Sequence, residues 1–309
     1  MAPGSRIARL TAHISAPSSA AAAQQEGVVA VDAELARLGF APIASSVVTT
    51  ALAELDEKGY TVVEGMIDER WLGQLRETFD ALSAAEGRLG GLEVLPEARQ
   101  QELLRSDAPG PNPGIRRLGD LVNKSPCFDG IWQNPLLITI VAGVLPGPFK
   151  VHSLNGHDPL AGQGRQALHA DWGGFPASMG HIAGANKLAG ERPPRLFGVV
   201  NSAWCLDDFS AEAGATRVVP RSHLRAGSSP AEDADREAVQ VVAKAGSVVI
   251  WNGSTWHGGC LNAKGSRRRA VHCAWLDRQF DQQTNQQKYL REETAARLTP
   301  LHRYLLDVQ

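Results

Sequence analysis

The spacing of apolar residues changes near residue 149, and this change constrains the fold more than any other feature of the chain. Before it, apolar side chains recur every three or four residues, which is typical of one face of a helix. After it, they alternate with polar residues in short segments separated by Gly and Pro, which is typical of half-buried strands. Such segments predict strands at residues 149–154, 165–170, 196–206, 216–219, 240–243, 247–251 and 267–276. Many short strands without intervening helices favour an antiparallel sandwich or barrel.

The first half of the chain is predicted to be mainly helical, with one more helix near the end. Asp68 can cap a helix from Glu69 to about Ala85, because its side chain accepts hydrogen bonds from the first free backbone N–H groups of a helix. Residues 60–64 are predicted to form a short strand. Further helices are predicted after Asn134-Pro135 and within residues 285–306.

The composition along the chain predicts one folded domain behind a flexible N-terminal arm. The arm comprises residues 1–45, which are rich in Ala and Ser and contain few large apolar groups. Residues 46–309 are predicted to form a single domain. Its parts are a helical region at 46–148, a β-rich core at 149–278 and the C-terminal helix at 285–306.

The overall composition argues against several classes of protein. The 309 residues are 43% hydrophobic and 21% charged, and the net charge of −2 predicts no basic surface for nucleic acid or an anionic membrane. No apolar run approaches the roughly 20 residues that cross a membrane. The four cysteines show no C-x-x-C spacing, so we expect reduced thiols and a cytoplasmic location. The expected partner is a small-molecule substrate, and the sequence leaves a monomer and a homodimer both open.

The segment Leu168–Trp172 places an imidazole and a carboxylate two residues apart. Residues i and i+2 of an extended strand share a face, so His169 and Asp171 can reach a common point. His257 is the best candidate for a third ligand. Two imidazoles and one carboxylate form a triad that leaves coordination positions open and suits non-haem Fe(II). Considered alone, however, a His-x-Asp triplet is more often a surface turn with a local hydrogen bond.

Five stretches in a fixed order resemble the phytanoyl-CoA dioxygenase family of Fe(II)/2-oxoglutarate-dependent oxygenases. The resemblance extends from about residue 50 to residue 276. The stretches are LDEKGYTVVEG at 55–65, LHADW at 168–172, AWCLDDF at 203–209 with AGATRVVPRSH at 213–223, AGSVVIWN and WHGG within 245–259, and RRA at 268–270. The resemblance implies a mainly β fold with flanking helices, built around a double-stranded β-helix, the cupin-like jelly-roll.

The same resemblance implies an enzyme, its cofactors and their ligands. Fe(II) is expected at His169, Asp171 and His257, with 2-oxoglutarate as co-substrate and O2 as oxidant. The family places an arginine eleven residues after the distal histidine, here Arg268, where it pairs with the far carboxylate of 2-oxoglutarate. A planar guanidinium suits that role because it donates two charge-assisted hydrogen bonds to one carboxylate. Asn155, on the strand before the His-x-Asp segment, is expected near the co-substrate.

Strand alternation assigns the neighbours of Arg268 to different surroundings. Arg267 and Arg269 should point to the opposite face, where we expect solvated charges at the strand edge. His272 shares the face of Arg268 and is a further candidate for the pocket wall. A shift of the strand by one residue would exchange these roles. His223 is expected to be structural.

The reaction outcome is less constrained than the chemistry of the site. Asp171 favours hydroxylation over halogenation, because halogenating relatives carry a small residue in its place. Desaturation, ring closure and epimerisation use the same triad and stay open, as do a metal-binding jelly-roll protein without turnover and a zinc or manganese hydrolase. The expected substrate is a small metabolite or natural product of secondary metabolism. Residues 173–195 are expected to form a lid over it, with a passive surface loop as the alternative.

Overall fold

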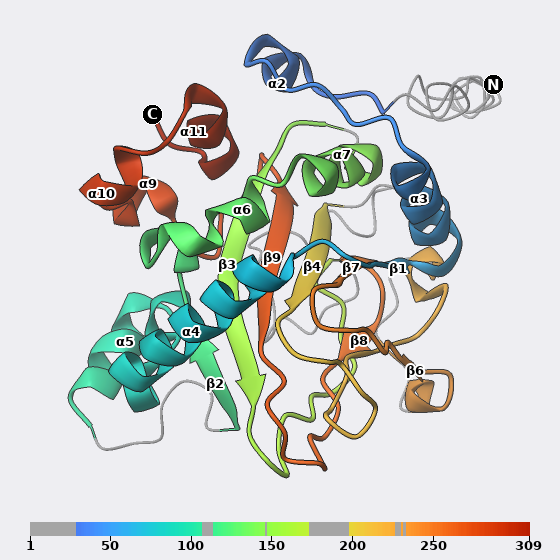
Figure 1. Ribbon diagram of the computed structural model, residues 1–309, viewed down its shortest axis with the longest axis vertical. Coiled ribbons are helices and arrows are strands. Elements are labelled where there is room, and N and C mark those ends of the chain that lie inside the picture. Colours follow the sequence, from blue (N-terminus) through green and yellow to red (C-terminus); the bar gives the residue numbers. More distant parts are fainter. Residues whose placement is uncertain (1–28, 107–113, 146, 173–197, 226–229, 231–232) are drawn as a thin grey trace, which may run out of the picture.

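Two antiparallel β-sheets form the centre of the computed structural model, which describes residues 29–106, 114–145, 147–172, 198–225, 230 and 233–309 (Figure 1). The larger sheet contains β1 (Tyr60–Val63), β7 (Val248–Asn252), β4 (Val199–Cys205), β9 (Ala270–Asp277), β3 (Phe149–Pro159) and β2 (Ile115–Leu118), in that spatial order. The smaller sheet contains β6 (Val239–Gln240), β5 (Arg217–Val218) and β8 (His257–Gly258), in that order. Neighbouring strands are antiparallel throughout.

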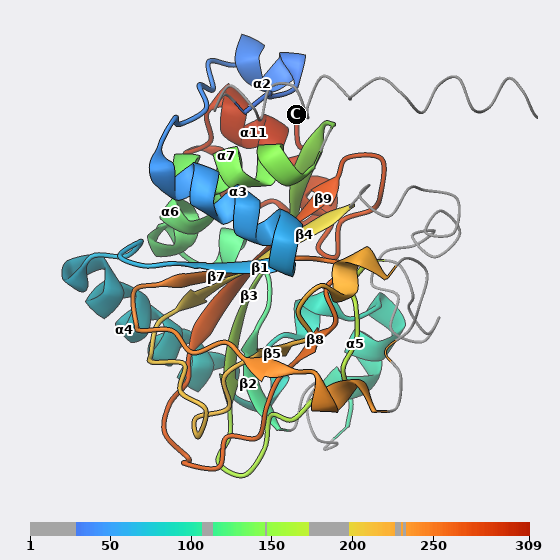
Figure 2. The same cartoon turned by 90° about the vertical axis from the view of Figure 1, so that its right-hand side faces the viewer.

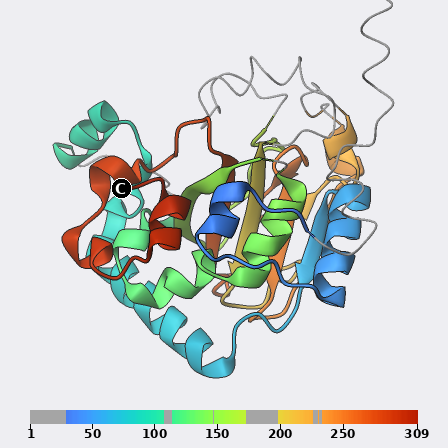
Figure 3. The ribbon, with the colours of Figure 1, turned by 90° about the horizontal axis from the view of Figure 1, so that it is seen from above.

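Several helices cover the larger sheet on the side away from the smaller one (Figure 2). The α-helices are α2 (Ala33–Arg37), α3 (Ser46–Lys58), α4 (Glu69–Glu86), α5 (Glu97–Leu104), α6 (Asp129–Trp132), α7 (Pro135–Val144), α9 (Gln286–Tyr289), α10 (Glu292–Ala295) and α11 (Pro300–Leu306). Short 3-10 helices are η2 (Gly87–Leu89), η3 (Leu92–Val94), η4 (Leu121–Asn123), η5 (Pro126–Phe128), η7 (Ser222–Leu224) and η8 (Ala234–Arg236). Figure 2 shows α3, α4, α6 and α7 on the opposite side of the larger sheet from β5 and β8, and Figure 3 shows the helical layer from above.

Side-chain chemistry sets the boundaries of the helices that cover the sheet. Asp68 Oδ1 accepts a hydrogen bond from the Trp71 N–H at 2.8 Å and caps α4, as predicted. Asn134 Oδ1 caps α7 in the same way by accepting from two backbone N–H groups. Gly59 ends α3 with a φ of 87°, a left-handed conformation that glycine adopts without steric strain. The chain then enters β1 directly, which places this edge strand beside β7.

Strand alternation divides the core into two layers. On β7, Val248 and Ile250 pack with the helices, whereas Val249 and Trp251 face the smaller sheet. The same alternation on β9 puts Val271, Cys273 and Trp275 under the helices. The space between the two sheets is therefore lined by the other face of these strands, which carries more polar side chains.

Three predicted elements differ in the structure. Residues 165–170 form no regular strand; instead, His169 makes an isolated β-bridge with His257. Strand β9 begins at Ala270 rather than at residue 267, because carboxylate side chains hold the preceding arginines. The predicted C-terminal helix is divided into α9, α10 and α11, since Pro300 begins a new helix behind a Thr299 cap.

The predicted boundary of the N-terminal arm at residue 45 is wrong. Asp32 caps α2, and Val29, Leu35 and Phe40 are buried in the main hydrophobic cluster. A few spaced apolar side chains can dock a segment on an existing core, although they could not form a core by themselves. The rest of the predicted arm, residues 1–28, lies outside the described residues.

One stretch of the described chain, Pro126–Val144, has the length and mean hydropathy, 1.2, of a membrane span, contrary to the expectation from the sequence. In the structure this stretch is divided among η5, α6 and α7. Half of it (50%) is buried inside the fold, and Leu137, Ile140 and Val141 are fully enclosed. We therefore assign the stretch to the hydrophobic core that supports the larger sheet.

Candidate active site

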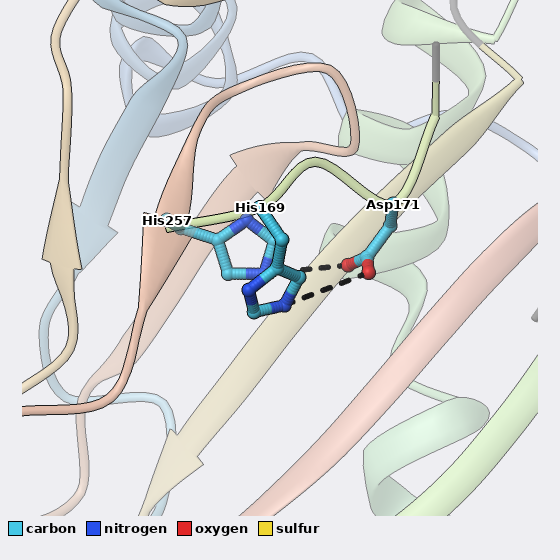
Figure 4. A group of neighbouring side chains, drawn as sticks. All are labelled: His169, Asp171 and His257. Carbon is cyan, nitrogen blue, oxygen red and sulfur yellow. Dashed lines mark ion pairs between the residues drawn. The ribbon is translucent and has the colours of Figure 1, made fainter. Parts of the chain in front are cut away.

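The three side chains predicted as metal ligands meet between the two sheets (Figure 4). The ligand atoms of His169, Asp171 and His257 all lie within 4.8 Å of one another, and this is the one such group in the described part of the chain. The Nε2 atoms of His169 and His257 are 3.9 and 3.4 Å from the Asp171 carboxylate oxygens. Two imidazoles and one carboxylate are a donor set that fits Fe(II).

Backbone pairing sets the positions of the two histidines. The His257 N–H donates to the His169 carbonyl at 2.8 Å, and the His169 N–H donates back to the His257 carbonyl at 2.9 Å. The buried Arg217 on β5 donates hydrogen bonds to the carbonyl oxygens of Gln166 and Gly259, and so links the two segments that carry His169 and His257. Residues far apart in sequence are thereby held with their imidazoles side by side, at 4.4 Å between ring centroids.

Hydrogen bonds also fix which nitrogen of each imidazole faces the common point. The Nδ1 atoms of His169 and His257 each lie 2.9 Å from a backbone carbonyl oxygen. Because a carbonyl only accepts, each Nδ1 carries the proton and each Nε2 keeps its lone pair for a metal. Asn201 on β4 donates to Asp171 Oδ2 at 2.7 Å and orients the carboxylate.

A cavity of about 140 Å³ adjoins the three ligands. Its wall comes from β2, β3, β4, β7, β8 and β9 and from the segments that follow β3, β4, β8 and β9. The remaining lining residues are Ile115, Arg117, His152, Ser153, Asn155, His157, Gly164, Gln166, Val199, Asn201, Thr216, Trp251, Gly259, Arg268, His272, Ala274 and Gln283.

Arg268 lies in this wall without an acidic side-chain partner among the described residues. It is 5% exposed, and its Nε and Nη1 atoms have no hydrogen-bond partner. Its guanidinium lies over the Phe209 ring at 4.6 Å, and burial lowers its pKa to about 10, so it stays charged at neutral pH. A buried charge is unfavourable unless a counter-charge meets it, so this position suits an anionic ligand.

The expectation of solvated charges on either side of Arg268 needs correction. Arg269 is only 8% exposed and binds the Asp207 carboxylate. Arg267 is more exposed, but its Nε donates to Asp158 at 2.7 Å. Alternation does keep both residues out of the cavity lining. It could not reveal their partners, which come from other parts of the chain.

Sequence reasoning missed a second arginine of the cavity, Arg117 on β2. Its Nε has no hydrogen-bond partner among the described residues, and burial lowers its pKa to about 10. Its stem packs against Gly91, where an added β-carbon would lie 2.8 Å from Arg117 Cγ. No local signal marks Arg117, because only the pairing of β2 with β3, opposite His157, brings it into the site.

Asn155 lies in the cavity wall and is joined there by a residue that the sequence did not indicate. Asn155 Nδ2 donates to Gln283 Oε1 at 2.9 Å, and the Gln283 N–H donates to His152 Nδ1 at 3.0 Å. All three side chains line the cavity. Gln283 follows β9 and lies beyond residue 276, where the sequence resemblance ends, so the resemblance could not identify it.

Two stacked histidines complete the inner wall. The rings of His157 and His272 lie 4.2 Å apart at an angle of 12°. Burial and the nearby arginines lower the pKa of both residues, that of His272 to about 3, so both are neutral at physiological pH. The structure places His272 in the cavity wall with Arg268, the face assigned to it by strand alternation.

Two further predictions concern residues away from the cavity lining. His223 approaches the carbonyl oxygen of Asp56 through Nε2 at 3.0 Å, in agreement with a structural role. The predicted lid, residues 173–195, lies outside the described residues.

Solved structures share this fold at low sequence identity. The epimerase SnoN, crystallised with Fe3+, alpha ketoglutarate and nogalamycin RO, is 17% identical over 76% of this chain and 85% of its own, with a TM-score of 0.56. The carbocyclase SnoK from nogalamycin biosynthesis is 19% identical over 81% and 90%, with a TM-score of 0.54. HygX from Streptomyces hygroscopicus, with nickel, 2-oxoglutarate and hygromycin B, is 18% identical over 75% and 88%, with a TM-score of 0.53. These similarities confirm the predicted jelly-roll core.

Sequence comparisons identify the family as well as the fold. The uncharacterised protein Rv1501 of Mycobacterium tuberculosis is 28% identical over 233 residues, 73% of this chain and 74% of the relative. Dioxygenase trt7 of Aspergillus terreus is 28% identical over 173 residues, 55% of this chain and 57% of the relative. The family model of phytanoyl-CoA dioxygenase (PhyH) matches residues 55–270, which is most of the chain. This chain therefore belongs to the phytanoyl-CoA dioxygenase family.

Proposed function

We propose that this protein is an Fe(II)- and 2-oxoglutarate-dependent dioxygenase that oxidises a small molecule, most readily by hydroxylation. One observation carries the proposal. A single cavity combines the His169, Asp171 and His257 ligand set with two arginines, Arg268 and Arg117, that have no acidic side-chain partner among the described residues. The ligand set fits Fe(II), and the arginines fit a dicarboxylate.

The charges of the cavity support this pair of ligands. Apart from its histidines, the ionisable residues in the described lining are Arg268, Arg117 and Asp171. Burial keeps His157 and His272 neutral. Fe(II) would add two positive charges beside Asp171, and 2-oxoglutarate would add two negative ones. We assign Arg268 to the far carboxylate of 2-oxoglutarate, as its place after His257 suggests, and Arg117 to the second carboxylate. Each buried guanidinium would then have a counter-charge.

When bound, Fe(II) and 2-oxoglutarate together reduce O2, convert 2-oxoglutarate to succinate and CO2, and oxidise the primary substrate. The residues of this chain hold and orient these groups. His169 and His257 present Nε2 because backbone carbonyls retain their Nδ1 protons. Asn201 fixes the Asp171 carboxylate, and the Trp251 ring packs against His257 at 5.1 Å between centroids. The site is thereby shielded from water on the side of β7.

The proposed substrate is a small metabolite or natural product of secondary metabolism. Two solved structures of similar fold contain a bound natural product, nogalamycin RO or hygromycin B, which supports this choice. Because two of the similar structures are an epimerase and a carbocyclase, epimerisation and ring closure are alternative outcomes. Free thiols at all four cysteines agree with a cytoplasmic location. A mass-spectrometric screen of metabolites incubated with the Fe(II)-loaded protein and 2-oxoglutarate under 18O2 would detect gain of one labelled oxygen atom. Oxidised products without label would indicate another outcome than hydroxylation.

Binding of both cofactors is tested without knowledge of the primary substrate. Under anaerobic conditions, addition of 2-oxoglutarate to the Fe(II)-loaded protein should produce a visible metal-to-ligand charge-transfer absorption. The His257→Ala variant should lose this absorption together with tight Fe(II) binding. A wild-type protein that binds Fe(II) but gives no absorption with 2-oxoglutarate would argue against a chelating co-substrate.

A further inference from the structure

Three consecutive arginines precede β9, and the middle one alone lacks an acidic side-chain partner in the described structure. Arg267 Nη2 and Arg269 Nη1 share the Asp80 carboxylate, at 2.5 and 2.8 Å. Arg269 also binds Asp207. Arg268 lines the cavity, and its Nε and Nη1 atoms have no hydrogen-bond partner in the described structure. Arg267 and Arg269 are therefore paired with acidic side chains, whereas Arg268 is available to a ligand.

Asp158, near the end of β3, binds both the backbone and a side chain of this arginine segment. It is fully buried, with 0% exposure. Its Oδ1 accepts from the backbone N–H of Arg268 at 3.1 Å, while its Oδ2 accepts from Arg267 Nε at 2.7 Å and from Arg116 Nη1 at 2.9 Å. One carboxylate thus holds the backbone of Arg268 and the side chain of Arg267 at the same time.

Regular strand pairing does not provide this restraint. The ladder between β3 and β9 ends at the pair His157–Ala270, so the backbone at Arg268 lies beyond it. The Asp158 carboxylate takes the place of a ladder bond there, and its charge attracts the Arg267 guanidinium away from the cavity. Without it, a second cation one residue from Arg268 would lose a buried partner, and the register of the segment would be held less firmly.

We propose that Asp158 is a positioning residue for the co-substrate, because it fixes Arg268 as the arginine that faces the cavity. The inference rests on the proposed function, in which Arg268 binds the far carboxylate of 2-oxoglutarate. Asp158 is not among the residues that line the cavity, so it acts through Arg268. Its removal should therefore weaken 2-oxoglutarate binding and spare the metal ligands.

The test is a calorimetric titration of 2-oxoglutarate into protein loaded with Ni(II), which replaces Fe(II) and prevents turnover. Asp158→Ala removes all three hydrogen bonds of this carboxylate and should weaken 2-oxoglutarate binding about tenfold or more, the usual effect of losing a charged hydrogen bond. Asp158→Asn keeps an oxygen acceptor for the Arg268 N–H and should lose less. Ni(II) affinity should stay within about twofold of wild type in both variants, which is smaller than any lost ligand would allow.

Asp80→Asn is the matched control. It removes a carboxylate from Arg267 and Arg269 but has no contact with the Arg268 backbone, so 2-oxoglutarate affinity should be unchanged.

Two results would contradict the assignment, and a third would contradict the proposed function. Unchanged 2-oxoglutarate affinity in folded Asp158→Ala would overturn the assignment, as would parallel losses of Ni(II) and 2-oxoglutarate affinity, which indicate a general structural role. If Asp158→Ala does not fold, Asp158→Asn decides the question by the same two affinities. Failure of the wild-type Ni(II) protein to bind 2-oxoglutarate would contradict the proposed function itself.

Discussion

Some of the buried polar atoms that have no hydrogen-bond partner in the described part of the chain belong to residues of the cavity wall. In the described structure they include Arg268 Nε and Nη1, Arg117 Nε, His272 Nε2 and Trp251 Nε1. Such atoms are uncommon in folded proteins, because each loses its hydrogen bonds to water without replacement. The unpartnered guanidinium atoms of Arg268 and Arg117, in the same cavity as three metal-type ligands, indicate that an anionic ligand completes the site. Arg267 and Arg269, which lie on the same segment but outside the cavity, form ion pairs with Asp80, Asp158 and Asp207.

Replacement of Arg268 should affect co-substrate binding far more than replacement of its neighbour. Loss of a bidentate pair in a shielded pocket is worth about 2–5 kcal/mol, so Arg268→Ala should weaken 2-oxoglutarate binding by roughly 30-fold or more. Arg267→Ala, whose side chain is 41% exposed, should change it much less. Titration of both variants measures the difference. A larger loss of affinity in Arg267→Ala would show that the roles of the arginines are exchanged.

Each ligand of the triad should be indispensable. We expect His169→Ala, Asp171→Ala and His257→Ala each to abolish turnover and to weaken Fe(II) binding, because no other group of His, Cys, Asp or Glu in the described structure offers a replacement. Metal content after dialysis and succinate formation measure the two effects separately. Full activity in any of these variants would remove that residue from the site.

The stacked histidines should make the protein sensitive to acid. Burial holds the pKa of His157 and His272 below the ordinary value of 6.5, and that of His272 at about 3. As the pH falls through 6.5 towards 3, the unfolded chain therefore takes up protons that the folded protein excludes, and stability decreases. His272→Gln should flatten this decline in denaturant titrations between neutral and acidic pH. An equally steep decline in that variant would mean that His272 does not contribute.

The turn between α3 and β1 supports the segment that leads into β8. Thr255 Oγ1 donates to the Gly59 carbonyl at 2.9 Å. A β-carbon on Gly59 would lie 2.4 Å from Thr255 Oγ1 and 2.5 Å from His223 Nδ1. The helical region thus restrains the backbone two residues before His257. This contact gives the helical layer a part in positioning the metal site.

Two glycine variants test the role of this turn. Gly59→Ala should lose about 1–2 kcal/mol of stability from the left-handed backbone, and more from the contacts with Thr255 and His223. Because Thr255 leads into His257, metal affinity should fall as well. Gly39→Ala is the control, since Gly39 has a similar φ of +86° and open space around it. Denaturant titration and metal binding should show the larger loss in Gly59→Ala; equal losses would contradict a specific role for the turn.

Elements with strong local signals were predictable from the sequence, and those held by distant contacts were not. The segments that form β4 and β7 are short runs rich in apolar and β-branched residues, and the sequence predicts both as strands. Residues 165–170 are also predicted as a strand, but their backbone pairs only with the short β8, so a single β-bridge forms instead. The start of β9 was missed because Asp158, more than one hundred residues earlier, competes for the backbone N–H of Arg268.

Across the whole molecule, the candidate site joins local motifs to long-range partners. The triad and Arg268 belong to motifs that the sequence displays. Arg117 enters from β2 and Gln283 from the segment after β9, and only the tertiary structure brings them to the cavity. The same distinction explains the N-terminal error, since the docking of residues 29–45 depends on a surface that other elements create.

In the proposed function, the protein binds Fe(II) in this cavity and uses it to convert 2-oxoglutarate and O2 to succinate and CO2. The most direct measurement is succinate formed by the Fe(II)-loaded protein from 2-oxoglutarate, with and without O2. We predict slow, O2-dependent succinate formation without a primary substrate, faster formation in the presence of a substrate-containing metabolite extract, and none in the His257→Ala variant. If the wild-type protein binds Fe(II) and 2-oxoglutarate yet forms no succinate under O2 with or without that extract, the proposed function is contradicted, and a metal-binding protein without turnover becomes the better account.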